Sequence, residues 1–198
     1  MGWRDKRKIM QSYDVTAEMY DERYAEEQHR KYSKTLENVN VTSKTVLDVG
    51  CGSGLFFSQV AYKAGIVVGV DLSRKLLTKA KKHIKAFQNT FVLQADADHL
   101  PFKDRFFDNI FSFTVLQNMP KPPQTLRELE RVTKKDGKVV ATGLKKAFPL
   151  EKFMDILEDS GFRVVAFVDE DTINCYVAIL VREGSAQEKV EKIRLNKH

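Results

Sequence analysis

The sequence predicts an α/β protein built on a doubly wound sheet of seven strands. Short apolar runs of strand length alternate with segments of helical periodicity, which is typical of a parallel sheet with helices on both faces. The first apolar run ends in a glycine-rich turn that leads directly into another apolar segment. The last two runs, residues 163–168 and 174–182, lie close enough in sequence to pair as a terminal antiparallel hairpin.

The individual elements follow from the same patterns. Residues 1–40 are expected to be helical, because Tyr13, Ala17, Tyr20 and Tyr24 recur at spacings of three and four. The remaining strands are expected at residues 44–49, 66–70, 90–94, 108–113 and 137–142. Helices are expected at residues 55–64, 73–86, 122–133 and 149–160. The chain thus divides into an N-terminal helical lid (1–40), a ligand-binding domain (41–183) and a charged tail (184–198).

Composition limits the class of protein. The 198 residues are 42% apolar and 30% charged, as expected for one globular domain. No apolar run approaches the roughly 18 residues of a membrane span, and the charged N-terminus lacks an apolar signal core. We therefore expect a cytoplasmic protein without membrane contact. Two cysteines, Cys51 and Cys175, make neither a disulfide framework nor a metal set, so no metal is expected.

The glycine turn indicates a binding site for a cation rather than a phosphate. Gly50, Gly52 and Gly54 suit positive φ angles or close approach of the backbone to a ligand. The Gly-Lys-Ser/Thr of a phosphate loop is missing, and Asp48 just before the turn would repel a pyrophosphate. A carboxylate at this position suits an ammonium group instead. A tight turn and helix start without any ligand is the alternative.

A second carboxylate restricts the chemical class of the ligand. Asp71 ends the next strand, at the distance from the glycines where nucleotide-binding α/β folds place an acidic residue on the ribose hydroxyls. A ligand with an ammonium end and a ribose end fits both carboxylates. S-adenosylmethionine has both, and the strand–turn–helix pattern is that of a Rossmann-like fold.

Five motifs in order resemble those of the class I S-adenosylmethionine-dependent methyltransferases. The resemblance covers about residues 13–182 and is strongest to the group that contains the ubiquinone and menaquinone biosynthesis C-methyltransferases. One departure is Asp136-Gly137, where the family usually has Gly-Gly. The motifs are Val-Leu-Asp-Val-Gly-Cys-Gly-Ser-Gly (46–54), Gly-Val-Asp-Leu-Ser (69–73), Asp-Ala-Asp-His-Leu-Pro-Phe (96–102), Phe-Phe-Asp (106–108) and Leu-Arg-Glu-Leu-Glu-Arg-Val (126–132).

The resemblance implies roles for these residues, with residues 41–183 as the S-adenosylmethionine-binding methyltransferase domain. Asp98 is expected to be exposed to solvent, and a turn-capping role is the alternative for Asp96. The implied cofactor-binding residues are Asp48 at the ammonium, Gly50, Cys51, Gly52 and Gly54 in the turn, Asp71 on the ribose, Leu72 against the adenine, Asp96 and Ala97 at the adenine amine, and Ser112 and Phe113, with Thr114, below the sulfonium.

The sequence says less about the residues that would bind the methyl acceptor. Tyr13 and Tyr20 resemble a family motif whose tyrosines cover the cofactor, although both could simply form the buried stripe of a helix. Gln117 and Asn118 can hydrogen-bond an amide or a base edge but cannot act as bases near neutral pH. This disfavours acceptors that must be deprotonated. His29 is the one histidine considered for proton transfer, with a solvated helix face as the alternative.

The net charge of +6 is compatible with an RNA partner but does not require one, because solvated helix faces would explain it equally well. We expect a methyltransferase acting on a base nitrogen of rRNA or tRNA. The alternatives are a small-molecule methyltransferase, a protein amine methyltransferase and a non-catalytic cofactor-binding regulator. Basic residues that could form an RNA footprint beside the pocket are Arg4, Lys6, Arg7 and Lys8, and Lys134, Lys135, Lys138, Lys145 and Lys146.

Overall fold

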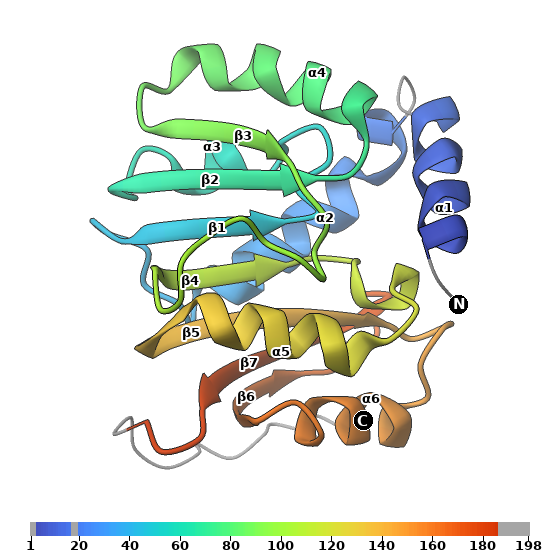
Figure 1. The fold of residues 1–198 in the computed structure, drawn as a ribbon, viewed down its shortest axis with the longest axis vertical. Helices are drawn as coiled ribbons and strands as arrows, with labels where there is room; N and C mark the ends of the chain where they lie inside the picture. Colours follow the sequence, from blue (N-terminus) through green and yellow to red (C-terminus); the bar gives the residue numbers. More distant parts are fainter. Residues whose placement is uncertain (1–2, 17–19, 186–198) are drawn as a thin grey trace.

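The computed structural model describes residues 3–16 and 20–185 and shows one seven-stranded sheet (Figure 1). The strand order is β3-β2-β1-β4-β5-β7-β6, and β7 runs opposite to the other six strands of the described sheet. This confirms the predicted fold class, including the terminal hairpin. The strands are β1 (Thr45–Val49), β2 (Ile66–Asp71), β3 (Thr90–Gln94), β4 (Phe107–Ser112), β5 (Thr133–Leu144), β6 (Phe162–Val168) and β7 (Cys175–Arg182).

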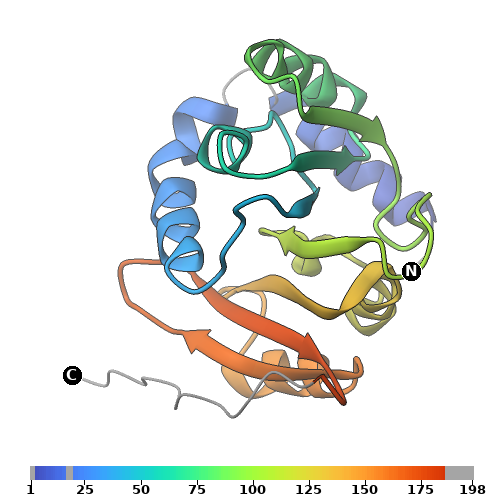
Figure 2. The ribbon, with the colours of Figure 1, turned by 90° about the vertical axis from the view of Figure 1, so that its left-hand side faces the viewer.

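Helices cover both faces of the sheet and create two cores (Figures 1 and 2). One core joins the sheet to α2, α3 and α4, and the other joins it to α5 and α6. The remaining helix, α1, lies beyond the carboxyl ends of the first strands (Figure 1). The helices are α1 (Trp3–Thr16), α2 (Tyr20–Leu36), α3 (Phe57–Val60), α4 (Arg74–His83), α5 (Pro122–Val132) and α6 (Leu150–Glu158), with 3-10 turns η1 (Ile84–Ala86) and η2 (Leu116–Asn118).

Two predicted elements differ in length from those observed. The helix expected at 55–64 is only the single turn α3, because the Asn89 side chain binds the carbonyls of Ala61 and Ala64 at 2.9 Å each. These carbonyls are thereby satisfied without further helix. The strand expected at 137–142 extends over all of β5, which pairs with β4 across a register shift between Phe107 and Asn109.

The topology places a crevice at one edge of the sheet. β1 pairs with β2 on one side and β4 on the other, so the strand order reverses at β1. Ligands in open α/β sheets bind outside the carboxyl ends of the strands at such a switch point. Within the described ranges, no helix is both long and apolar enough to cross a membrane.

Candidate functional site

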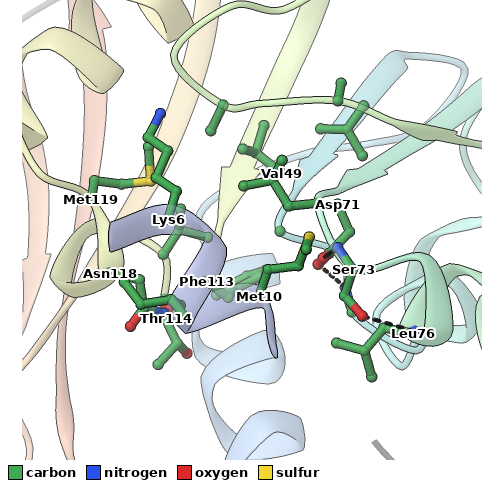
Figure 3. A pocket seen from close by; sticks show the side chains of 18 residues that line it. Lys6, Met10, Val49, Asp71, Ser73, Leu76, Phe113, Thr114, Asn118 and Met119 are labelled. Carbon is green, nitrogen blue, oxygen red and sulfur yellow. Dashed lines mark hydrogen bonds between the residues drawn. The ribbon is translucent and has the colours of Figure 1, made fainter. Parts of the chain in front are cut away.

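A pocket lies where the loops after β1, β2, β3 and β4 meet, and α1 covers it (Figure 3). Met10 points from α1 toward Asp71, whereas the Lys6 side chain extends on the side of Met119 (Figure 3). Of the predicted cofactor residues, Gly50, Gly52, Asp71, Leu72, Ala97 and Phe113 line this pocket, together with Lys6, Ile9, Met10, Val49, Val70, Ser73, Leu76, Ala95, Thr114, Val115, Asn118 and Met119.

The glycine turn is held against the Asp71 carboxylate. The φ angles of Gly50 and Gly52 are +71° and +56°, which residues with a side chain rarely adopt. Gly52 donates its N–H to one oxygen of Asp71 at 2.9 Å, and Ser73 donates its N–H to the other at 2.7 Å. Burial raises the pKa of Asp71, and these two N–H groups oppose that effect. Each oxygen keeps a lone pair for a ligand hydroxyl.

Asp48 is a buried carboxylate that lacks a described cation or hydrogen-bond donor. It is 2% exposed, and desolvation together with the nearby charge of Asp71 raises its pKa to about 8. A buried carboxyl group is costly unless a donor or cation satisfies it. The site therefore favours a ligand that carries an ammonium group.

Helix α2 supplies a second acceptor beside Asp48. Gln28 and Tyr32 line a small hollow with Asp48, Cys51 and other residues of the glycine turn. The Gln28 side-chain oxygen is buried, and no group in the described part of the chain donates a hydrogen bond to it. Two acceptor groups thus converge on the place where an ammonium would sit. Burial and the carboxylates of Asp48 and Asp71 raise the pKa of the Cys51 thiol.

Asp96 and Asp98 bind a lysine from the covering helix. Lys6 Nζ lies 2.6 and 2.9 Å from the two oxygens of Asp96 and 2.5 Å from Asp98 Oδ2. The expectation that Asp98 is exposed is wrong, because it is 8% exposed and also accepts the Thr125 hydroxyl. Lys6 itself is 7% exposed, so it does not belong to an RNA footprint. Asp96, expected at the adenine amine, binds Lys6 and is not among the residues that line the pocket.

The end of β4 forms the floor of the pocket. Thr114 has a φ of +61°, unusual for a residue with a β-branched side chain, and its N–H is bound by the Thr142 hydroxyl at 2.7 Å. Gln117 and Asn118 both donate side-chain N–H groups to the Thr114 carbonyl, at 2.7 and 3.2 Å. Asn118 lines the cofactor pocket, whereas Gln117 faces a neighbouring groove.

The remaining predicted residues lie elsewhere. Ser112 is fully buried and does not line the pocket, and Gly54 packs against the Phe57 ring with a φ of +86°. The side chains of Tyr13 and Tyr20 are outside the described part of the structure. His29 is exposed on α2 and packs edge-on against Tyr32.

Sequence reasoning missed Lys31, whose side chain is buried beside the floor of the pocket. Lys31 Nζ lies 3.2 Å from Thr114 Oγ1 and 3.5 Å from Glu27 Oε1. The helical spacing of polar residues could have indicated it, because Gln28, Lys31 and Thr35 recur at spacings of three and four. All three are buried in the structure. Polar residues on the buried face of α2 therefore marked this side of the site.

Comparisons with known proteins agree with this geometry. Residues 47–141 match a family described as a methyltransferase domain. The chain is 36% identical over 119 residues to a demethylmenaquinone methyltransferase of Staphylococcus saprophyticus, covering 58% of this chain and 51% of the relative. It is 33% identical over 140 residues to a malonyl-[acyl-carrier protein] O-methyltransferase of Halorhodospira halophila, covering 69% and 48%. The chain thus spans about half the length of these curated relatives.

A solved structure shares the fold. An S-adenosylmethionine-dependent methyltransferase from Aquifex aeolicus superposes with a TM-score of 0.67 at 24% identity, covering 75% of this chain and 88% of that one. The chain thus contains a region that matches a methyltransferase domain, on a fold that it shares with a solved S-adenosylmethionine-dependent methyltransferase.

Proposed function

We propose that this protein transfers a methyl group from S-adenosylmethionine to a base nitrogen of rRNA or tRNA. When bound, S-adenosylmethionine supplies an electrophilic methyl group on a sulfonium. The protein's contribution is then positioning and exclusion of water. Asp48 and Gln28 would hold the ammonium, Asp71 the ribose, and the floor at Thr114 would orient the acceptor.

The observation that carries the RNA acceptor is a basic groove next to the cofactor pocket. It encloses about 900 Å³ and shares Met119 with that pocket. Lys121, Arg127 and Lys152 line it, all three are exposed, and no carboxylate is among its described lining residues. Cations spaced along a groove suit the phosphates of a nucleic acid strand.

Gln117 supports a nitrogen acceptor at the inner end of this groove. Its side-chain N–H donates to the Thr114 carbonyl. Its side-chain oxygen is buried and accepts no hydrogen bond from the described groups. A buried amide oxygen can accept a hydrogen bond from an exocyclic amine. An acceptor nitrogen with its own lone pair needs no protein base, in keeping with the neutral Gln117 and Asn118.

A small-molecule acceptor is the second candidate. The acceptors named for the two curated relatives, demethylmenaquinone and malonyl-[acyl-carrier protein], are not RNA and favour this candidate. Lys31, a buried cation beside the Thr114 floor, would lie near such an acceptor. In that case the groove cations have no role in selecting the acceptor.

Charge reversal in the groove tests the RNA proposal. We expect Lys121→Glu combined with Arg127→Glu to weaken binding of bulk tRNA and to reduce the salt dependence of binding, because two phosphate contacts are lost. Lys63→Glu, an exposed lysine beyond α3, is the matched control and should bind as the wild type does. Equal binding by all three proteins in a filter-binding titration over salt concentration would contradict the proposal.

A further inference from the structure

The edge of the sheet at β3 exposes large apolar side chains beside a strand with one free edge. β3 is the terminal strand of the described sheet. Phe91 and Leu93 are 55% and 42% exposed, and Ile66 on β2 is 41% exposed. The register places Phe91 beside Val68 and Leu93 beside Val70, so the patch lies on the same face as α5 and α6. Those helices cover the other end of that face (Figure 1).

The backbone of β3 can accept another strand. Ala95 donates its N–H to the Asp71 carbonyl of β2. Because successive residues of a strand direct their backbone groups to opposite sides, Thr90, Val92 and Gln94 direct theirs away from β2. Edges of this kind are usually protected by charges, proline or a covering element. Here the solvent-facing residues include Phe91 and Leu93 instead.

The same edge is strongly basic. Between Leu72 and Gln94 the sequence has no aspartate or glutamate. This stretch forms α4, η1 and β3, and α4 packs against β3. A partner for the edge must therefore be acidic. The cations of the stretch are Arg74, Lys75, Lys79, Lys81, Lys82 and Lys85.

We propose that β3 is a docking edge for an acidic partner protein, which adds a strand whose apolar residues alternate with acidic ones. Its apolar side chains pack on Ile66, Phe91 and Leu93, its backbone pairs with Val92 and its neighbours, and its carboxylates face the cations of α4. A second copy of this chain does not fit, because β3-to-β3 pairing would bring two basic α4 helices together. RNA fits less well, because it cannot use the outward backbone groups of a strand.

The test uses a synthetic peptide in which valine and isoleucine alternate with glutamate. Its control has the same composition with the apolar residues grouped at one end. We expect the alternating peptide to shift the backbone amide NMR signals of Thr90, Val92 and Gln94, with binding that weakens as salt rises. Absence of shifts at these amides, or equal binding of the grouped peptide, would overturn the proposal.

Two pairs of variants separate side-chain packing from strand pairing. Phe91→Glu should weaken peptide binding at least about tenfold, whereas Tyr62→Glu, an exposed aromatic outside the patch, should leave it unchanged. Gln94→Pro removes an outward N–H and should weaken binding, whereas Gln94→Ala should not. All four should keep the wild-type affinity for S-adenosylmethionine, which shows that they are folded.

A second copy of this chain and RNA, the alternative partners of the β3 edge, would each give a different experimental result. If light scattering shows a wild-type dimer that Phe91→Glu dissociates, the edge joins two copies and the acidic-partner proposal is wrong. If tRNA shifts the Thr90, Val92 and Gln94 amides and displaces the peptide, the edge is an RNA surface and the proposal is equally wrong. A monomer whose edge amides respond to the peptide and not to tRNA supports it.

Discussion

We expect Asp48 to make cofactor binding dependent on pH. In the folded protein its pKa is about 8 against an ordinary value of 3.8, so it is mostly protonated at pH 6. An ammonium ligand favours the ionised carboxylate. We expect the affinity for S-adenosylmethionine to rise from pH 6 toward pH 8, by up to about tenfold per unit, and to level off as the ligand's amino group loses its own proton.

Calorimetry in buffers of different ionisation enthalpy checks this expectation, because binding below pH 8 should release a proton. Asp48→Asn should bind more weakly and lose the pH dependence. A wild-type affinity that stays constant between pH 6 and 8 would contradict the assigned role. The same shift predicts that the empty wild-type protein loses stability as pH rises between about 4 and 8, because the folded state retains a proton that the unfolded chain releases.

Asp71 has a structural role in addition to its proposed role in ligand binding, so the choice of substitution matters. Its two oxygens hold the N–H groups of Gly52 and Ser73. Asp71→Asn keeps one acceptor oxygen but loses the charge, and we expect cofactor binding to weaken by roughly 1.5–3 kcal/mol. Calorimetry measures the loss, and a melting curve close to the wild type's would confirm an intact turn. Unchanged affinity would mean that the ribose is bound elsewhere.

At the scale of elements, α1 is held over the pocket by one buried ion pair cluster. Lys6 joins α1 to Asp96 and Asp98, and the Ser73 hydroxyl binds Asp14 farther along the helix. We expect Lys6→Gln to speed the hydrogen exchange of the α1 backbone amides, because the helix loses its charged contacts to the sheet. Lys8→Gln, an exposed neighbour, should leave this exchange unchanged.

The elements also show which features a sequence can predict. Strand β3 has its predicted bounds, because a short apolar run between turn signals leaves little choice. The helix expected at 55–64 is cut short by Asn89, a residue from a different segment. The Lys6–Asp96 contact spans 90 positions, and no local pattern signals it. Local periodicity thus predicted the sheet and the glycine turn, whereas the covering of the pocket depends on long-range pairing.

At the scale of the whole molecule, positive charge is unevenly placed. The groove of Lys121, Arg127 and Lys152 adjoins the cofactor pocket, whereas the cations of α4 border the β3 edge. Lys6, expected among the surface cations, is instead buried in ion pairs with Asp96 and Asp98. The basic residues behind the net charge of +6 therefore gather on at least two separate surfaces, and the net charge alone could not show this.

The most direct measurement is transfer of a radiolabelled methyl group from S-adenosylmethionine into total RNA, protein and small-molecule fractions of cells that lack the enzyme. Under the RNA proposal, we expect label in RNA, on a nucleoside whose added mass is that of methyl groups. We also expect this label to be lost when Lys121 and Arg127 are replaced by glutamate. Label confined to the small-molecule or protein fraction, or no transfer despite tight cofactor binding, would contradict the proposal.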